Sequence, residues 1–337
     1  MAQADIEESN RILRKCVHCG FCNATCPTFL LLGDELDGPR GRIYLIKDMI
    51  ENDRPATEKI ARHIDRCLSC LACMTTCPSG VHYMHLVDHG RRHIEKTYRR
   101  PLADRLLRDF LAWIMPDPAR FRRMMGLARL AKPLALLLPG RIGAMGRLTP
   151  GKLPAPGLTA TPRVFPAEGR RQKRVALLAG CVQQALDPAI NDATVRLLTR
   201  HGCEVTVSEG AGCCGSLTHH LGRDALDFAR ANVDAWMREL DRGGLDAVIV
   251  NASGCGTTVK DYGFMLREDP AYAAKAAKIS ALARDVSEFM ASLGLKPAQI
   301  APGMRVAYHS ACSLQHGQRV HVQPKQLLAQ AGFAVLD

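Results

Sequence analysis

Eight cysteines near the start of the chain form two runs of identical spacing. Each run reads C-x2-C-x2-C-x3-C and is followed at once by proline, and the runs are Cys16, Cys19, Cys22 and Cys26, then Cys67, Cys70, Cys73 and Cys77. Three closely spaced thiolates can bind one [4Fe–4S] cluster, while the fourth reaches only the other cluster. The spacing therefore predicts two clusters, the first on Cys16, Cys19, Cys22 and Cys77 and the second on Cys67, Cys70, Cys73 and Cys26.

Zinc is the alternative metal for such cysteines, since structural zinc sites also use C-x2-C pairs. On that interpretation the chain would be a zinc-stabilised binding module without enzymatic activity. Two complete four-cysteine runs, each with its proline, favour iron–sulfur clusters over zinc. The first ten residues lack a basic start and an apolar signal segment, so we expect a cytoplasmic protein with reduced cysteines.

A second group of cysteines lies in the C-terminal half. Cys181, the pair Cys213-Cys214, Cys255 and Cys312 each follow a stretch that reads as a buried strand. The carboxyl ends of parallel strands meet at one edge of a sheet, where ligands bind. We therefore expect a third metal or redox site on Cys181, Cys213, Cys214 and Cys255, with Cys312 a less favoured member. A thiol–disulfide reductase centred on Cys213 and Cys214 is the alternative enzyme class.

The elements that must position these cysteines differ between the two halves. Apolar residues at helical spacing separate the first two runs, which predicts an α-helical ferredoxin-type domain over residues 1–95. From residue 173 onward, strands predicted at 174–180, 203–208, 247–251, 305–309 and 333–336 alternate with helices, which indicates a parallel α/β sheet. The fold class is thus α followed by α/β.

Two further segments separate these domains. Residues 96–148 form a basic helical segment, and residues 149–172 form a Pro-rich linker. Residues 91–147 hold 14 Arg and Lys against 4 Asp and Glu, which is most of the net charge of +12. A basic amphipathic helix suits an anionic membrane surface or an acidic partner, although a solvated face of the protein's own domain explains it equally. No nucleic-acid motif appears, so we expect no nucleic-acid binding.

An internal repeat occupies residues 173–337. VALLAGC, ending at Cys181, resembles VAYHSAC, ending at Cys312, and residues 196–207 resemble residues 326–337. The first copy spans about 173–300 and the second about 301–337, so the second copy stops at Asp337 without the counterpart of Cys213-Cys214. This predicts a fragment or a natural short form. Residues 210–215 match G-x-G-x-x-G, but they follow the second strand rather than the first, so we expect neither NAD nor flavin on this chain.

Together these motifs resemble the iron–sulfur subunit of bacterial glycolate oxidase, within a wider family marked by the cysteine-rich CCG domain. Residues 39–44 (PRGRIY) and 251–256 (NASGCG) share the resemblance, which covers nearly the whole chain. The wider family includes subunits of anaerobic glycerol-3-phosphate dehydrogenase, of lactate utilisation and of heterodisulfide reductase. One departure is that Cys255 is followed by Gly256, Thr257 and Thr258, where heterodisulfide-reductase-like members complete a C-x-x-C.

The resemblance implies an electron-transfer subunit that is not catalytic alone. A flavin-containing partner would oxidise a 2-hydroxy acid such as glycolate, and this chain would pass the electrons to a quinone or a similar acceptor. The equivalent subunits for glycerol-3-phosphate or lactate are alternatives. Contact of the basic segment 91–147 with the inner face of the cytoplasmic membrane would suit a quinone acceptor.

Overall fold

The computed structural model describes residues 3–137, 139–296 and 303–336, and the chain divides into two compact units. Unit 1 comprises Met1–Arg108, Ser216–Ala225 and His309–His321. Unit 2 comprises Asp109–Gly215, Leu226–Tyr308 and Val322–Asp337. These units differ from the consecutive domains expected from the sequence, because two short segments of the C-terminal half belong to unit 1.

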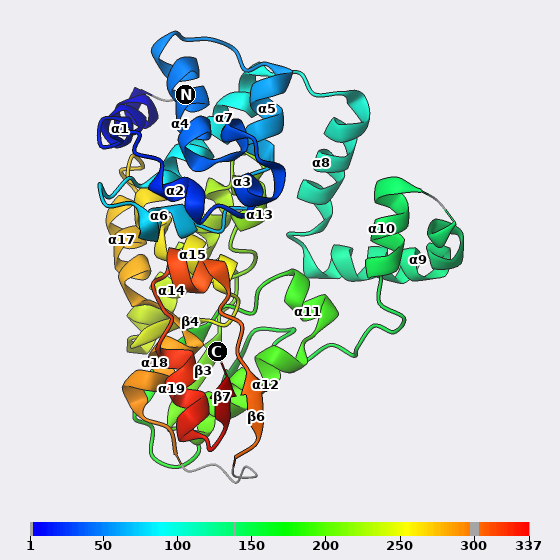
Figure 1. The fold of residues 1–337 in the computed structure, drawn as a ribbon. Helices are drawn as coiled ribbons and strands as arrows, with labels where there is room; N and C mark the ends of the chain where they lie inside the picture. The colour runs from blue at the N-terminus through cyan, green and yellow to red at the C-terminus, as the bar shows by residue number, and fades with distance from the viewer. Residues whose placement is uncertain (1–2, 138, 297–302, 337) are drawn as a thin grey trace. The chain divides into compact units, whose positions relative to one another are not determined.

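Unit 1 is built of helices, as the spacing of its apolar residues predicts. The helices are α1 (Gln3–Leu13), α2 (Phe21–Ala24), α3 (Pro27–Leu32), η1 (Glu35–Asp37), α4 (Pro39–Glu51), α5 (Glu58–Asp65), α6 (Ala72–Thr76) and α7 (Tyr83–Thr97), followed by α8 (Leu102–Ile114), which runs on into unit 2 (Figure 1). Ile46 and Met49 of α4 and Leu86 of α7 are fully buried in one core. That core also contacts several of the cysteines.

Two glycines allow the helices of unit 1 to approach closely. A Cβ atom added to Gly41 of α4 would lie 2.1 Å from the backbone oxygen of Glu35 in η1. One added to Gly90 of α7 would lie 3.0 Å from the side chain of Ile46. Because α4 leads away from the first cysteine run, this packing fixes the position of the backbone that follows Cys26.

The segments from the C-terminal half complete unit 1. They contain α13 (Ser216–His220) and the π-helical turn η2 (Ser313–Gly317). Gly222, with a φ of +78°, lies so close to α7 that an added Cβ would be 2.4 Å from the carbonyl oxygen of Arg91. His316 lies 2.8 Å from the hydroxyl of Thr75, which belongs to the second cysteine run.

Unit 2 contains a five-stranded sheet of order β1-β3-β2-β4-β5 among the described residues. The strands are β1 (Arg163–Phe165), β2 (Lys173–Leu177), β3 (Cys203–Val207), β4 (Ala247–Val250) and β5 (Ala283–Asp285). Only β1 runs antiparallel to its neighbour. The predicted parallel sheet is confirmed for β2, β3 and β4.

The sheet separates two cores, and helices form most of the rest of unit 2. They are α9 (Pro118–Leu136), α10 (Gly140–Leu148), α11 (Val182–Leu186), α12 (Ala189–Arg200), α14 (Leu226–Gly243), α15 (Ser253–Lys260), α16 (Tyr262–Met265), α17 (Ala273–Leu282), α18 (Val286–Leu293) and α19 (Gln323–Gln330). Val175 and Leu177 of β2 belong to one core, and Ala176 belongs to the other. This alternation is the pattern of a strand that is buried on both faces.

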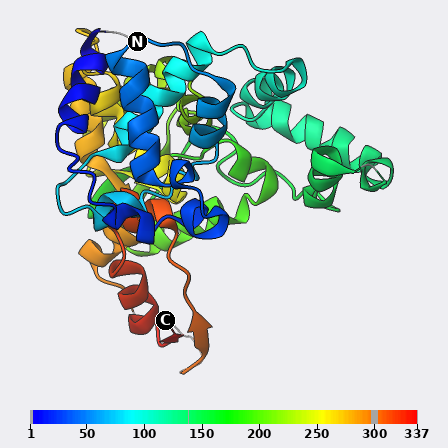
Figure 2. The same cartoon turned by 45° about the horizontal axis from the view of Figure 1, so that its top comes forward.

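Three parts of unit 2 differ from the expectation. β1 lies within residues 149–172, predicted to be a linker, and β5 lies within a stretch predicted to be helical. The strands expected at 305–309 and 333–336 form a separate parallel pair, β6 (Arg305–Ala307) and β7 (Ala334–Leu336), instead of joining the larger sheet. Figure 2 shows the orange β6 beside the red α19. Asp337, where the second repeat stops, lies outside the described residues.

The close approach at Gly41 gives a stability prediction. Gly41→Ala should destabilise unit 1 by about 1–3 kcal/mol, because the added methyl group meets backbone that cannot move aside. Gly126→Ala is the matched control, since Gly126 also lies inside a helix but has nothing within 4 Å of its added Cβ. The control should be neutral or stabilising by about 0.5–1 kcal/mol in thermal unfolding. Equal melting temperatures for the two variants would contradict the role of Gly41.

Candidate metal centres

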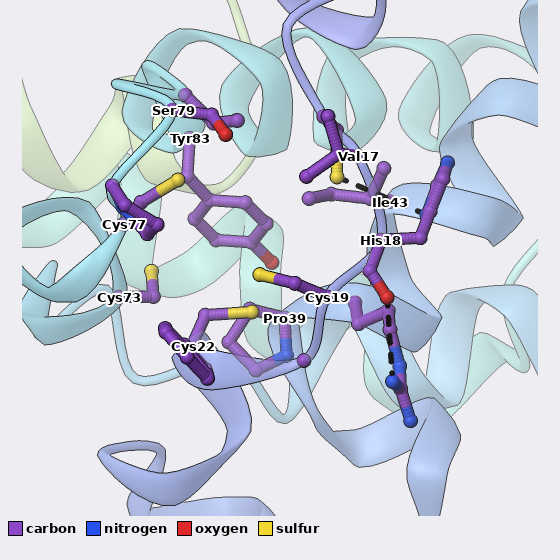
Figure 3. Close-up of a pocket in the computed structure, with 16 residues that line it drawn as sticks. Val17, His18, Cys19, Cys22, Pro39, Ile43, Cys73, Cys77, Ser79 and Tyr83 are labelled. Carbon is purple, nitrogen blue, oxygen red and sulfur yellow. Dashed lines mark hydrogen bonds between the residues drawn. The ribbon is translucent and has the colours of Figure 1, made fainter.

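The predicted cysteines for the first cluster line one pocket of unit 1. Cys16, Cys19, Cys22 and Cys77 surround it, with Cys73 and Tyr83 beside them. Figure 3 shows the sulfur atoms of Cys19, Cys22, Cys73 and Cys77 directed toward a common space. Cys77 comes from the second run, so the pocket combines the two runs as the spacing predicts.

The predicted cysteines for the second cluster line a separate pocket. Its cysteines are Cys26, Cys67, Cys70 and Cys73, with Tyr83 again on one wall. The Tyr83 hydroxyl is 3.9 Å from the sulfur of Cys67 and donates to it. Four thiols around each of two pockets form the donor set that [4Fe–4S] clusters require, so the residues fit these groups.

The loops of the two runs share an unusual backbone conformation. His18 and Ser69 occupy equivalent positions before the second cysteine of each run, with φ values of 54° and 51°. Gly20 and Leu71, also at equivalent positions, have φ values of 87° and 62°. Left-handed conformations of non-glycine residues cost about 1–3 kcal/mol each, and they cluster at functional sites. Loops with such conformations present backbone N–H groups to an anion, which suits a negatively charged cluster.

Burial keeps several of these thiols protonated when no metal is bound. Desolvation raises the pKa of Cys22 to about 11, and it also raises the pKa of Cys16 and Cys70. These cysteines would bind iron as thiolates, so cluster formation would be coupled to release of their protons.

A buried arginine contacts the second pocket. The Arg42 guanidinium, 1% exposed, lies 3.8 Å from the sulfur of Cys26 and donates to it, and it also donates to the Thr28 hydroxyl at 3.0 Å. Its Nε donates to the His63 carbonyl at 2.8 Å. Asp37 balances the charge from 3.6 Å. Although burial acts to raise it, hydrogen bonds from His63 and Arg66 lower the pKa of Asp37 overall.

A second buried ionic group lies behind the other cysteine run. Arg91 donates to the Cys67 carbonyl at 2.8 Å and to the Ser69 hydroxyl at 2.7 Å. Asp88, also buried, lies 3.3 Å from Arg91, and its two oxygens lie 3.3 Å and 3.1 Å from His219 and His220. Burial acts to raise the pKa of Asp88, but the charges and hydrogen bonds of the two histidines hold it well below its usual value.

Four cysteines of unit 2 come together, as their positions after the strands predict. Cys181 follows β2, Cys213 and Cys214 follow β3, and Cys255 lies in the first turn of α15 after β4. Their side chains hydrogen-bond in series, Cys181 to Cys213, Cys213 to Cys214 and Cys214 to Cys255.

Buried polar groups hold this series in place. Asn232 donates to the Cys213 carbonyl at 2.9 Å, and Tyr262 donates to the Cys214 carbonyl at 2.9 Å. Hydrogen bonds from the thiols of Cys181 and Cys214 lower the pKa of Cys213. The same bonds raise the pKa values of Cys181 and Cys214. A hydrogen bond from Cys214 also lowers the pKa of Cys255. The series therefore favours thiolate character at Cys213 and Cys255, a form suited to metal binding or to redox chemistry.

Cys312 is not part of this series. It lies in unit 1, where its charge interaction with Cys70 contributes to raising the pKa of Cys70. The expected approach of Cys312 to the strand ends of unit 2 is therefore corrected: the segment 309–321 packs with unit 1, although its sequence repeats that around Cys181.

The sequence analysis identified the cysteines but missed the residues that support them. Arg42, Arg91, Asp88 and Asn232 are buried partners of cysteine-bearing segments. Only the segment 39–44 gave a signal, as part of a family resemblance.

Comparison with known protein families agrees with this geometry. Residues 12–81 match the 4Fe-4S dicluster domain, and residues 175–260 match the cysteine-rich CCG domain. The chain is therefore an iron–sulfur electron-transfer protein with two [4Fe–4S] clusters. It belongs to the family of glycolate oxidase iron–sulfur subunits. It is 44% identical to the glycolate oxidase iron–sulfur subunit of Escherichia coli over 98% of this chain and 78% of that one.

More distant relatives extend the comparison. The probable glycolate oxidase iron–sulfur subunit of Bacillus subtilis is 31% identical over 94% of this chain and 74% of its own. Lactate utilization protein A of Bacillus subtilis is 27% identical over 46% of this chain and 64% of its own. No solved structure matches the chain significantly. Within the described residues, no helix has the length and apolar character needed to span a membrane.

Arg42 gives a prediction for the second cluster. Donors and cations near a ligating sulfur favour the reduced, more negative cluster. Arg42→Met should therefore lower the midpoint potential of the cluster beside Cys26, by roughly the 59 mV that corresponds to a tenfold change in a one-electron equilibrium. An EPR-monitored redox titration measures this shift. Arg66→Met is the control, because Arg66 binds the same Asp37 without contacting a cysteine. Equal potentials in both variants would contradict the role of Arg42.

Proposed function

We propose that this chain carries electrons from a flavin-containing subunit, which oxidises a 2-hydroxy acid of the glycolate type, to a quinone. The observation that carries the proposal is the pair of pockets in unit 1, each lined by at least four cysteines that come from both runs. The relatives named as iron–sulfur subunits of glycolate oxidase support the substrate class and the presence of a partner subunit. Bound clusters supply one-electron transfer, while the chain's own residues hold them and set their surroundings.

The pockets and the spacing together support an assignment of the ligands of the two clusters. We assign Cys16, Cys19, Cys22 and Cys77 to the first cluster and Cys26, Cys67, Cys70 and Cys73 to the second. We also propose that Cys181, Cys213, Cys214 and Cys255 bind a third cluster. Their hydrogen-bonded series and the low pKa of Cys213 support this assignment.

Metal content tests these assignments. Anaerobically purified protein should contain about twelve irons and twelve sulfides per chain, the amount that three four-iron clusters hold. Cys255→Ser should lose about four irons while two interacting [4Fe–4S] signals remain in the EPR spectrum after reduction. Cys22→Ser should instead disrupt that pair of signals.

Cys312→Ser is the control, since this exposed cysteine lies outside all three sets. If the wild-type protein contains eight irons and Cys255→Ser does not change that number, the third cluster is disproved. The cysteines of unit 2 would then serve thiol chemistry. Zinc in place of iron would disprove the electron-transfer function itself.

Contact with the cytoplasmic face of a membrane is a further part of the proposed function. Leu127, Leu130, Leu134 and Leu137 lie at helical spacing along α9 and its C-cap, and all four are 58–80% exposed. Residues 118–148 contain seven Arg and Lys and no acidic residue. An exposed apolar stripe with basic flanks suits the interface of an anionic bilayer. Within the basic segment, we therefore assign the contact to α9 and α10.

Vesicle binding tests this contact. The protein should co-sediment with vesicles of phosphatidylglycerol and phosphatidylcholine, and more weakly with phosphatidylcholine alone or in high salt. The double substitution Leu130→Gln and Leu134→Gln should weaken binding at least tenfold, because burying a leucine side chain contributes about 1.5 kcal/mol or more. Leu158→Gln, at an exposed leucine outside these helices, should bind normally. If the double variant binds vesicles as tightly as the wild-type protein, the contact is disproved.

A further inference from the structure

Unit 2 contains a cavity of about 870 Å³ beside its four cysteines. The end of α8, the start of α9, α11, α14 and the loop Gly210–Gly212 surround it, and Cys213 forms part of its wall. Small organic ligands occupy cavities of roughly 300–1,000 Å³. The cavity is therefore large enough for a cofactor-sized ligand next to Cys213.

The wall is mostly apolar and holds two aromatic rings. Trp113 and Phe228 line the cavity together with several alanines and prolines. The guanidinium of Arg120 lies 4.4 Å from the centre of the Trp113 ring and restricts its orientation. Such a wall favours a flat, apolar ligand over a small hydrophilic acid.

One polar group in the wall has a free donor. Arg122 donates through Nη2 to the carbonyl of Pro154, while its Nη1 is buried with no hydrogen-bond partner among the described residues. A buried charged donor without a partner is costly, and a ligand oxygen would remove that cost. Arginine has only donors, so the ligand atom must be an acceptor such as a carbonyl oxygen.

Small residues keep the cavity open beside Cys213. Cβ atoms built on Gly180 and Gly212 would meet nothing within 4 Å. Both glycines line the cavity. A ligand can therefore approach the backbone next to the sulfur of Cys213 without obstruction from neighbouring side chains.

We propose that this cavity binds the headgroup of a quinone, the acceptor of the electrons that the chain carries. The aromatic and aliphatic wall would contact the quinone ring, and Arg122 would donate to one of its carbonyl oxygens. The bound quinone takes two electrons from the iron–sulfur chain and two protons from water, and it leaves as the quinol. The electrons and protons balance those that the flavin partner removes from a 2-hydroxy acid.

Helix α9 links this cavity to the exposed leucines. Arg120 and Arg122, in its first turns, line the cavity, and Leu134 lies twelve residues beyond Arg122, which is about 18 Å along the helix. A quinone with its tail in a bilayer bound by α9 could thus present its headgroup to the cavity. This inference rests on the proposed function, since that function supplies the electrons.

Direct binding of a short-chain quinone tests the cavity. Isothermal titration of the anaerobic, cluster-loaded protein with ubiquinone-1 should show one site. Arg122→Gln should raise the dissociation constant about tenfold, because it removes a charged hydrogen-bond donor. Ala231→Trp, which fills part of the cavity from α14, should raise it at least as much. Arg123→Gln is the matched control, because Arg123 is the next arginine on α9 and does not line the cavity.

Reoxidation of the reduced protein separates this inference from the function on which it rests. With stoichiometrically reduced clusters, ferricyanide should reoxidise all variants at the same rate, whereas ubiquinone-1 should reoxidise Arg122→Gln and Ala231→Trp about tenfold more slowly than wild type. Unchanged quinone affinity and rate in both variants would disprove the cavity as the site. Failure of ferricyanide to reoxidise the wild type would disprove electron transfer itself. Binding of an organic disulfide, with no binding of ubiquinone-1, would assign the cavity to a thiol–disulfide substrate instead.

Discussion

The placement of positive charge beside buried cysteine loops is the constraint on which unit 1 depends. Arg42 and Arg91 are both buried, and each donates to the sulfur or the carbonyl of a cysteine. A buried guanidinium is tolerated only with a carboxylate nearby, which Asp37 and Asp88 provide. Each carboxylate is matched by at least one guanidinium, so the local charge is neutral or positive around centres that become more negative when they accept an electron.

The two cysteine runs share an exposed apolar residue as well as a backbone conformation. Val17 and Leu68 follow the first cysteine of each run, and they are 69% and 66% exposed. Each pocket thus has an apolar side chain at the surface above it, which limits water while keeping the pocket close to an approaching partner. Burial and access are in balance here, since electron transfer needs short distances and a stable cluster needs little water.

Features that depend on residues close together in the sequence were mostly predicted, and features that depend on distant residues mostly were not. Cluster ligation depends on spacing within a run, so the cysteines of both pockets were predictable. The supporting charges were not, because a buried Arg42 inside a helix has the same periodicity as a solvated one. β5 was missed since three residues between two helices are too few to show alternation. Cys312 was misplaced because its repeat partner, Cys181, follows a strand of a sheet that the second copy does not join.

Unit 1 is built from three separate segments of the chain, and this affects the order in which it assembles. Its last segment, His309–His321, is synthesised more than 200 residues after the last cysteine of the second run. A ribosome adds about 5–20 residues each second, so the N-terminal helices would wait ten seconds or more for the segments that pack against them. During that interval the cysteine loops would lack the contacts that these later segments provide. Loading of metal before closure would thus be favoured by the order of the chain itself.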